Sequence, residues 1–83
     1  MVTETLYPNP SKTGIFQLSL AKDYKSIDIM VCNVAGHLEK SIKAKSINKK
    51  INIDLSNFKS GVYFLNMSGF GEHIITKKAV IGQ

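Results

Sequence analysis

The sequence contains no arginine and no tryptophan, although it carries eleven lysines and a formal charge of +5. Arginine provides the forked contact to guanine and the flat cation that stacks on bases, whereas lysine acts as a point charge. The aromatic residues are also not interleaved with the lysines. These features argue against specific nucleic-acid binding and favour a solvated lysine surface that blunts the edges of a β-protein.

Long apolar runs are absent as well. No run approaches the length of a membrane-spanning helix, and residues 1–14 lack the apolar segment of a signal peptide. The 83 residues leave room for one domain. We expect residues 1–5 to be the remainder of a linker from a longer protein, residues 6–83 to form the domain, and the domain to be a monomer.

Residue types that catalyse reactions or bind metals are few and scattered. The six acidic residues occur one per segment, without the convergent pair that acid–base catalysis needs. Zinc ligands would have to come from Cys32, His37 and His73, which do not form a cluster. The single Cys32 cannot form an internal disulfide and is interpreted as a small apolar strand residue. We therefore expect no enzyme activity, no catalytic residue, no metal and no cofactor.

Apolar and polar residues alternate with a period of two along almost the whole chain, and turn signals separate the runs. This pattern predicts an all-β domain, a seven-stranded immunoglobulin-like Greek-key β-sandwich. The predicted strands are a short segment at 6–7 and longer ones at 15–20, 26–33, 38–44, 50–55, 61–68 and 73–81.

Three segments have a special backbone. The prolines of Tyr7-Pro8-Asn9-Pro10 end a strand, and the turn that follows closes at Gly14. Gly61-Val62-Tyr63 predicts a tyrosine corner, in which the ring packs on the core and the hydroxyl bonds the backbone upstream. In the pair Lys77-Lys78 the alternation of a strand turns one lysine inward, with its stem along the sheet.

The densest positive charge comes from the lysines between residues 40 and 50. A docking surface for an acidic or phosphorylated partner and a solvated edge strand with its loop both explain this run, and the second interpretation is favoured.

Taken together, Tyr7-Pro8-Asn9-Pro10, Ile53-Asp54-Leu55-Ser56, Gly61-Val62-Tyr63 and the lysine-bearing end at 77–81 resemble the type A carboxy-terminal sorting domain of the type IX secretion system of Bacteroidetes. The resemblance implies a signal that directs a fused amino-terminal passenger from the periplasm through the outer-membrane translocon. It also implies that a sortase-like protease then removes the domain, and that the passenger reaches the cell surface or the extracellular space.

By position, the resemblance places recognition at Pro8, Asn9, Pro10, Gly14, Gly61, Tyr63, Lys77, Lys78, Val80 and Ile81. One physical route is backbone pairing of the translocon with an accessible last strand. The alternatives are a non-catalytic immunoglobulin- or fibronectin-like module that binds sugar or protein, and a spacer. A binding module would need an exposed aromatic platform, for which Tyr24, Phe58 and Phe70 are the loop candidates.

Overall fold

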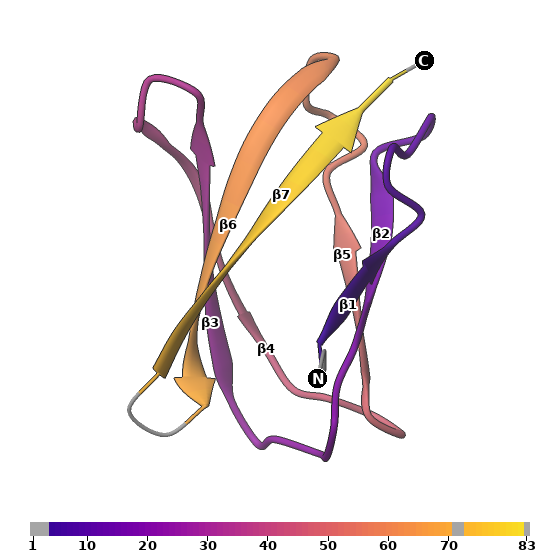
Figure 1. The fold of residues 1–83 in the computed structure, drawn as a ribbon, viewed down its shortest axis with the longest axis vertical. Coiled ribbons are helices and arrows are strands. Elements are labelled where there is room, and N and C mark those ends of the chain that lie inside the picture. The colour runs from indigo at the N-terminus through magenta and orange to yellow at the C-terminus, as the bar shows by residue number, and fades with distance from the viewer. Residues whose placement is uncertain (1–3, 71–72, 83) are drawn as a thin grey trace.

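The computed structural model describes residues 4–70 and 73–82, which form seven strands. Two antiparallel sheets face each other, with strand orders β1-β2-β5 and β4-β3-β6-β7 (Figure 1). The all-β sandwich is confirmed, while its immunoglobulin-like Greek-key character stays a prediction. The bounds are β1 Thr5–Tyr7, β2 Ile15–Ser19, β3 Ile27–Asn33, β4 Leu38–Ala44, β5 Lys50–Asp54, β6 Gly61–Phe70 and β7 His73–Ile81.

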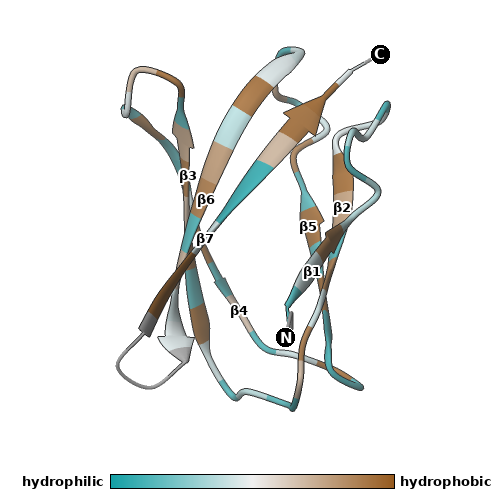
Figure 2. Cartoon of the chain, viewed as in Figure 1, coloured by the Kyte–Doolittle hydropathy of each residue, from teal (hydrophilic) through white to brown (hydrophobic). Residues whose placement is uncertain are grey.

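The core lies between the sheets and follows from the alternation along each strand. Every second residue of β2, β3 and β5 is buried, which appears in Figure 2 as brown bands that interrupt teal ones. Opposite residues in the register bring these side chains into rows, such as Phe16 with Ile53. The largest fully buried side chains are Phe16, Leu18, Ile27, Ile29, Ile53, Leu55, Leu65 and Met67.

The strand predicted at 61–68 is longer than expected, because Gly69 and Phe70 still belong to β6, and the turn that leads to the strand predicted at 73–81 therefore begins later. Gly69 lies at an irregularity of the register, and a Cβ atom there would come within 2.6 Å of the carbonyl oxygen of Ser26. The glycine therefore permits a close backbone approach inside the strand. Residues 71 and 72 of the predicted loop lie outside the described residues.

Several segments that are distant in sequence meet at one end of the sandwich. The hairpin between β3 and β4, the start of β6 and the end of β7 lie together at the top of Figure 1. The chain between β1 and β2 reaches the same end. No helix in the part of the chain that the structure describes is long and apolar enough to span a bilayer.

Candidate recognition site

The segment that follows β1 lies along the outer edge of β7, although Asn9 and Val80 are 71 residues apart. The Asn9 side chain accepts a hydrogen bond from the Val80 N–H at 2.9 Å and donates one to the Lys78 carbonyl at 2.6 Å. A neighbouring strand would bond these same groups, so the amide takes the place of one strand residue. Pro8 and Pro10 flank it, each after a cis peptide bond and each exposed.

The next contact is made by Ser11, which is buried. Its backbone N–H donates to the Val80 carbonyl at 2.8 Å, and its carbonyl accepts from the Gly82 N–H at 2.8 Å. Its hydroxyl donates to the Ile15 carbonyl at 2.9 Å and accepts from the Gly14 N–H at 3.0 Å. Ser11 thus joins the end of β7 to the turn that starts β2.

Gly14 supports this turn from the other side. It has a φ of 83°, and a Cβ atom there would come within 2.6 Å of the Leu55 carbonyl oxygen. Its own carbonyl accepts a hydrogen bond from the Leu55 N–H at 2.8 Å. A side chain would have to push backbone apart, so glycine is required here for the fold.

The predicted tyrosine corner is present at the start of β6. The Tyr63 hydroxyl donates to the Lys59 carbonyl at 2.8 Å, four residues upstream. Its ring packs edge-on against Phe58, with centroids 5.2 Å apart. In the register, Tyr63 lies opposite Ala79 and Gly61 lies opposite Ile81, so the corner holds the end of β7 from its inner edge.

The last strand divides its candidate residues between two faces. Lys77 lies opposite the buried Leu65 and is itself half-buried, as expected for an inward lysine that lays its stem along the sheet. Ile81 is also buried in the core. Lys78 is exposed and Val80 is half-buried on the outer face of the sheet.

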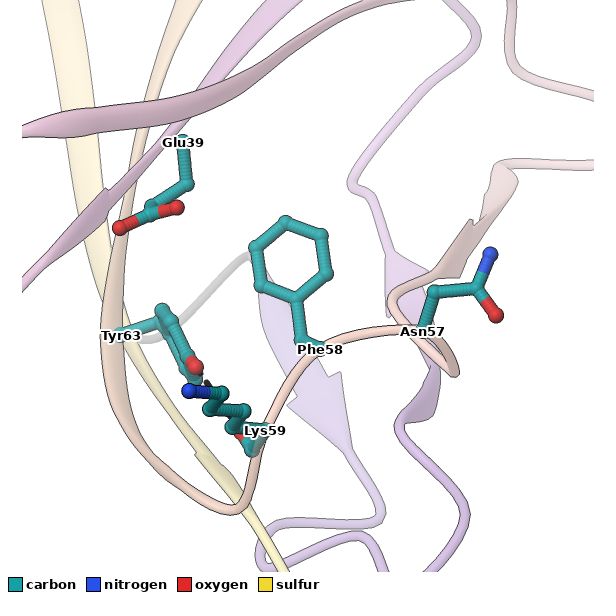
Figure 3. Close-up of a pocket in the computed structure, with 5 residues that line it drawn as sticks. All are labelled: Glu39, Asn57, Phe58, Lys59 and Tyr63. Atoms are coloured by element: carbon teal, nitrogen blue, oxygen red, sulfur yellow. Dashed lines mark hydrogen bonds between the residues drawn. The ribbon is translucent and has the colours of Figure 1, made fainter.

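A shallow depression of about 390 Å³ lies beside the tyrosine corner. Figure 3 shows Phe58 and Tyr63 facing it, with Glu39 and Lys59 nearby. The two rings meet at 77°, so they do not offer the flat platform on which a sugar stacks. Of the other aromatic candidates, Tyr24 is half-buried and lies at another loop, and the Phe70 side chain lies outside what the structure describes.

Two exposed carboxylates have a lowered pKa: Asp23 lies in the loop before β3, and Asp54 is the last residue of β5. The backbone N–H of Lys49 and then the Ser46 hydroxyl hold the pKa of Asp23 below its ordinary 3.8. Hydrogen bonds from Ser56, first from the side chain and then from the backbone, lower the pKa of Asp54. Both carboxylates organise turns. Among residues 4–70 and 73–82, no three His, Cys, Asp or Glu side chains gather as a metal site would require.

Backbone pairing along all of β7 does not agree with this geometry. The outer edge of the strand from Lys78 to Gly82 is already bonded by Asn9 and Ser11. The alternation of residues in the sequence does not predict this contact, because it is formed by an asparagine side chain and not by a strand. The one signal available was an asparagine held between two prolines, which lack donors of their own.

Comparison with known proteins identifies the family. Residues 5–82 match the family described as the secretion system C-terminal sorting domain. The chain belongs to this family. Its function is that of a type IX sorting signal, which leads through the periplasm to the cell surface or the extracellular space.

A relative of the sorting domain is beta-agarase A of Zobellia galactanivorans, which is 35% identical over 75 residues. The match covers 90% of this chain but only 13% of the agarase. The sorting domain therefore spans a small part of that enzyme, and most of the agarase lies outside the match.

Proposed function

We propose that the type IX machinery reads this domain at the end where Pro8-Asn9-Pro10 is bonded to the end of β7. The domain is carried behind an amino-terminal passenger, is recognised when folded, and is removed by a sortase-like protease. Residues 1–5 serve as the linker and 6–83 as the sorting domain. The observation that supports this reading is the double hydrogen bond of the Asn9 amide to β7.

Seven of the ten candidate residues each take one of two roles in this proposal. Some build the end of the sandwich: Asn9 and Gly14 through backbone contacts, Tyr63 through its corner, and Ile81 through the core. Others are displayed to a partner. The exposed members are Pro8, Pro10 and Lys78.

The family is one of signals, and we propose that this chain has no enzyme activity and needs no metal or cofactor. A relative that is an agarase suggests an exported enzyme as the kind of passenger. Cleavage in the linker before Thr5 would leave the sandwich intact, because β1 begins at Thr5.

The experiment is export of a reporter that carries a periplasmic signal at one end and this domain at the other, in a bacterium with a type IX system. Deleting the last seven residues is a poor test, because it removes the buried Ala79 and Ile81 from the core. Asn9→Ala is sharper, with Asn52→Ala as its matched control. Asn52 also bonds through its side chain, but on the opposite sheet.

We expect Asn9→Ala to leave the reporter in the periplasm and Asn52→Ala to export it like the unchanged domain. Equal export of both variants would contradict recognition at this end. Equal export of a reporter without any domain would contradict the sorting function itself. If the alternative of a sugar-binding module held, titration with agar oligosaccharides would show saturable binding, whereas we expect none.

A further inference from the structure

The outer face of the sheet β4-β3-β6-β7 is divided into two halves of different character. Away from the end of β7 it carries polar pairs, in which Lys43 contacts Asp28 at 3.5 Å and Thr76 donates to Asn66 at 2.8 Å, and one exposed apolar residue, Ile74. These pairs join neighbouring strands, as expected for the solvent face of an antiparallel sheet.

The half nearer the end of β7 is apolar. In the register, Cys32 lies opposite both Leu38 and Phe64, and Val62 lies opposite Val80. Directly opposite residues on one face have Cβ atoms about 5 Å apart, so these side chains form a continuous surface. We call this surface the apolar half. It consists of Cys32, Leu38, Val62, Phe64 and Val80, with Met30 at its border opposite Ser41 and Asn66.

These residues do not belong to the interior. Leu38 and Met30 are 57% and 47% exposed, and Phe64 and Val80 are half-buried. The hydrophobic core between the sheets contains none of them. An apolar patch that folding does not use is typical of an interaction surface.

One charge stands at the edge of the apolar half. Lys78 lies opposite Phe64 and is exposed, with its backbone carbonyl fixed by Asn9. Lys43 lies on the same outer face, but its charge is paired with Asp28. The apolar half therefore offers a partner a hydrophobic surface with the exposed Lys78 at its edge.

We propose that the apolar half is the docking surface for a protein of the export apparatus that presents apolar side chains beside a carboxylate, and that the carboxylate pairs with Lys78. This inference rests on the proposed function and specifies the partner's chemistry. The domain's formal charge of +5 would also steer it toward an acidic protein.

The charge pattern disfavours two other occupants. Binding to an anionic membrane uses clusters of lysines around the inserted apolar residues, whereas in the register of the described strands Lys78 is the one lysine directly opposite a member of this surface. A second copy of the domain would bring together two bodies that each carry +5.

The test uses the same reporter fused to the domain with Val62→Thr and Phe64→Thr together. Threonine keeps a high strand propensity while removing the apolar surface. The matched control is Ile15→Thr, because Ile15 is also exposed, at 48%, but on the outer face of the other sheet. We expect the double variant to lower the exported fraction about tenfold, as loss of an aromatic anchor does, with no change for the control.

A second variant covers the case in which the double variant folds poorly. Lys78→Glu leaves the core untouched and should lower export similarly, while Lys78→Arg should retain it. Normal export of a folded double variant, or of Lys78→Glu, would overturn the inference and leave the proposed function standing. Failure of the unchanged domain to export the reporter would instead contradict the proposed function.

Two measurements on the purified domain distinguish a protein partner from a second copy of the domain and from a membrane. Sedimentation of the purified domain should show a monomer, and flotation with vesicles of phosphatidylglycerol and phosphatidylethanolamine should leave it unbound. A dimer that the double variant dissociates, or vesicle binding that the double variant abolishes, would overturn the choice of a protein partner.

Discussion

On the outer face of β1-β2-β5, Tyr7 donates to Gln17 at 2.7 Å and Gln17 donates to Asn52 at 3.1 Å, which links all three strands. On the outer face of the other sheet, the upper row instead places Cys32 beside Phe64. Both faces cover the same core and meet the same solvent. The polar face is what folding alone requires, so the apolar one points to a use outside the domain.

The first way to test this comparison is to disturb the core that both faces cover. Phe16 is 1% exposed and contacts the interior from β2. Phe16→Ala should lower the free energy of unfolding by about 3–5 kcal/mol, because it removes a buried ring and leaves a cavity. Urea denaturation of the purified domain measures this change. A loss below about 1 kcal/mol would mean that the interior is not packed as described.

A smaller effect distinguishes two asparagines on opposite sides of the molecule. Asn9→Ala removes two hydrogen bonds to β7 and should cost about 1–2 kcal/mol, whereas Asn52→Ala removes one exposed bond and should cost about 0.5 kcal/mol. Thermal unfolding of both variants checks the order. Equal losses would show that the Asn9 amide does not fasten the last strand.

Substitutions on the outer faces of the two sheets should change the free energy of unfolding least. They test whether either outer face contributes to folding. Phe64→Thr and Gln17→Thr should each change the free energy of unfolding by less than about 1 kcal/mol, since neither residue belongs to the core. Denaturation curves with coincident slopes would support this. A loss from Phe64→Thr comparable to that from Phe16→Ala would show that the apolar half serves folding.

The pH dependence of stability depends on a loop residue, Asp23, that lies on neither outer face. It therefore gives a control that does not involve the two faces. The folded pKa of Asp23 lies below its ordinary 3.8, so its carboxylate stabilises the fold above that pH and loses this contribution as the pH falls through the folded value. Asp23→Asn should therefore lower the melting temperature at neutral pH and have less effect in acid. Melting temperatures across that range measure it, and a constant difference would contradict the assignment.

Sequence reasoning recovered the parts of the fold that depend on neighbouring residues. The alternation of Ile27, Ile29 and Val31 located a strand and its buried face, and the glycine before Tyr63 located the corner. Periodicity could not reveal that Asn9 would bond β7, because this contact joins segments 71 residues apart through a side chain.

The apolar half escaped prediction for a related reason. Cys32, Phe64 and Lys78 come from three strands, and only the register of β3, β6 and β7 brings them into one row. A pattern within one strand shows which residues point outward, but not which outward residues become neighbours. The recognition residues that the resemblance indicated are therefore of two kinds. Some stabilise the end of the sandwich where β7 finishes, and others are exposed to solvent there.

The central claim is that the apolar half serves export and not folding. The most direct test measures both export and stability for two single variants. Phe64→Thr alters the apolar half, whereas Ile53→Val alters the core and should cost about 0.5–1.5 kcal/mol. We predict that the Phe64→Thr domain stays folded while less of its reporter is exported, and that the Ile53→Val domain is exported like the unchanged domain. Export that follows the melting temperature, whichever surface is changed, would contradict the account.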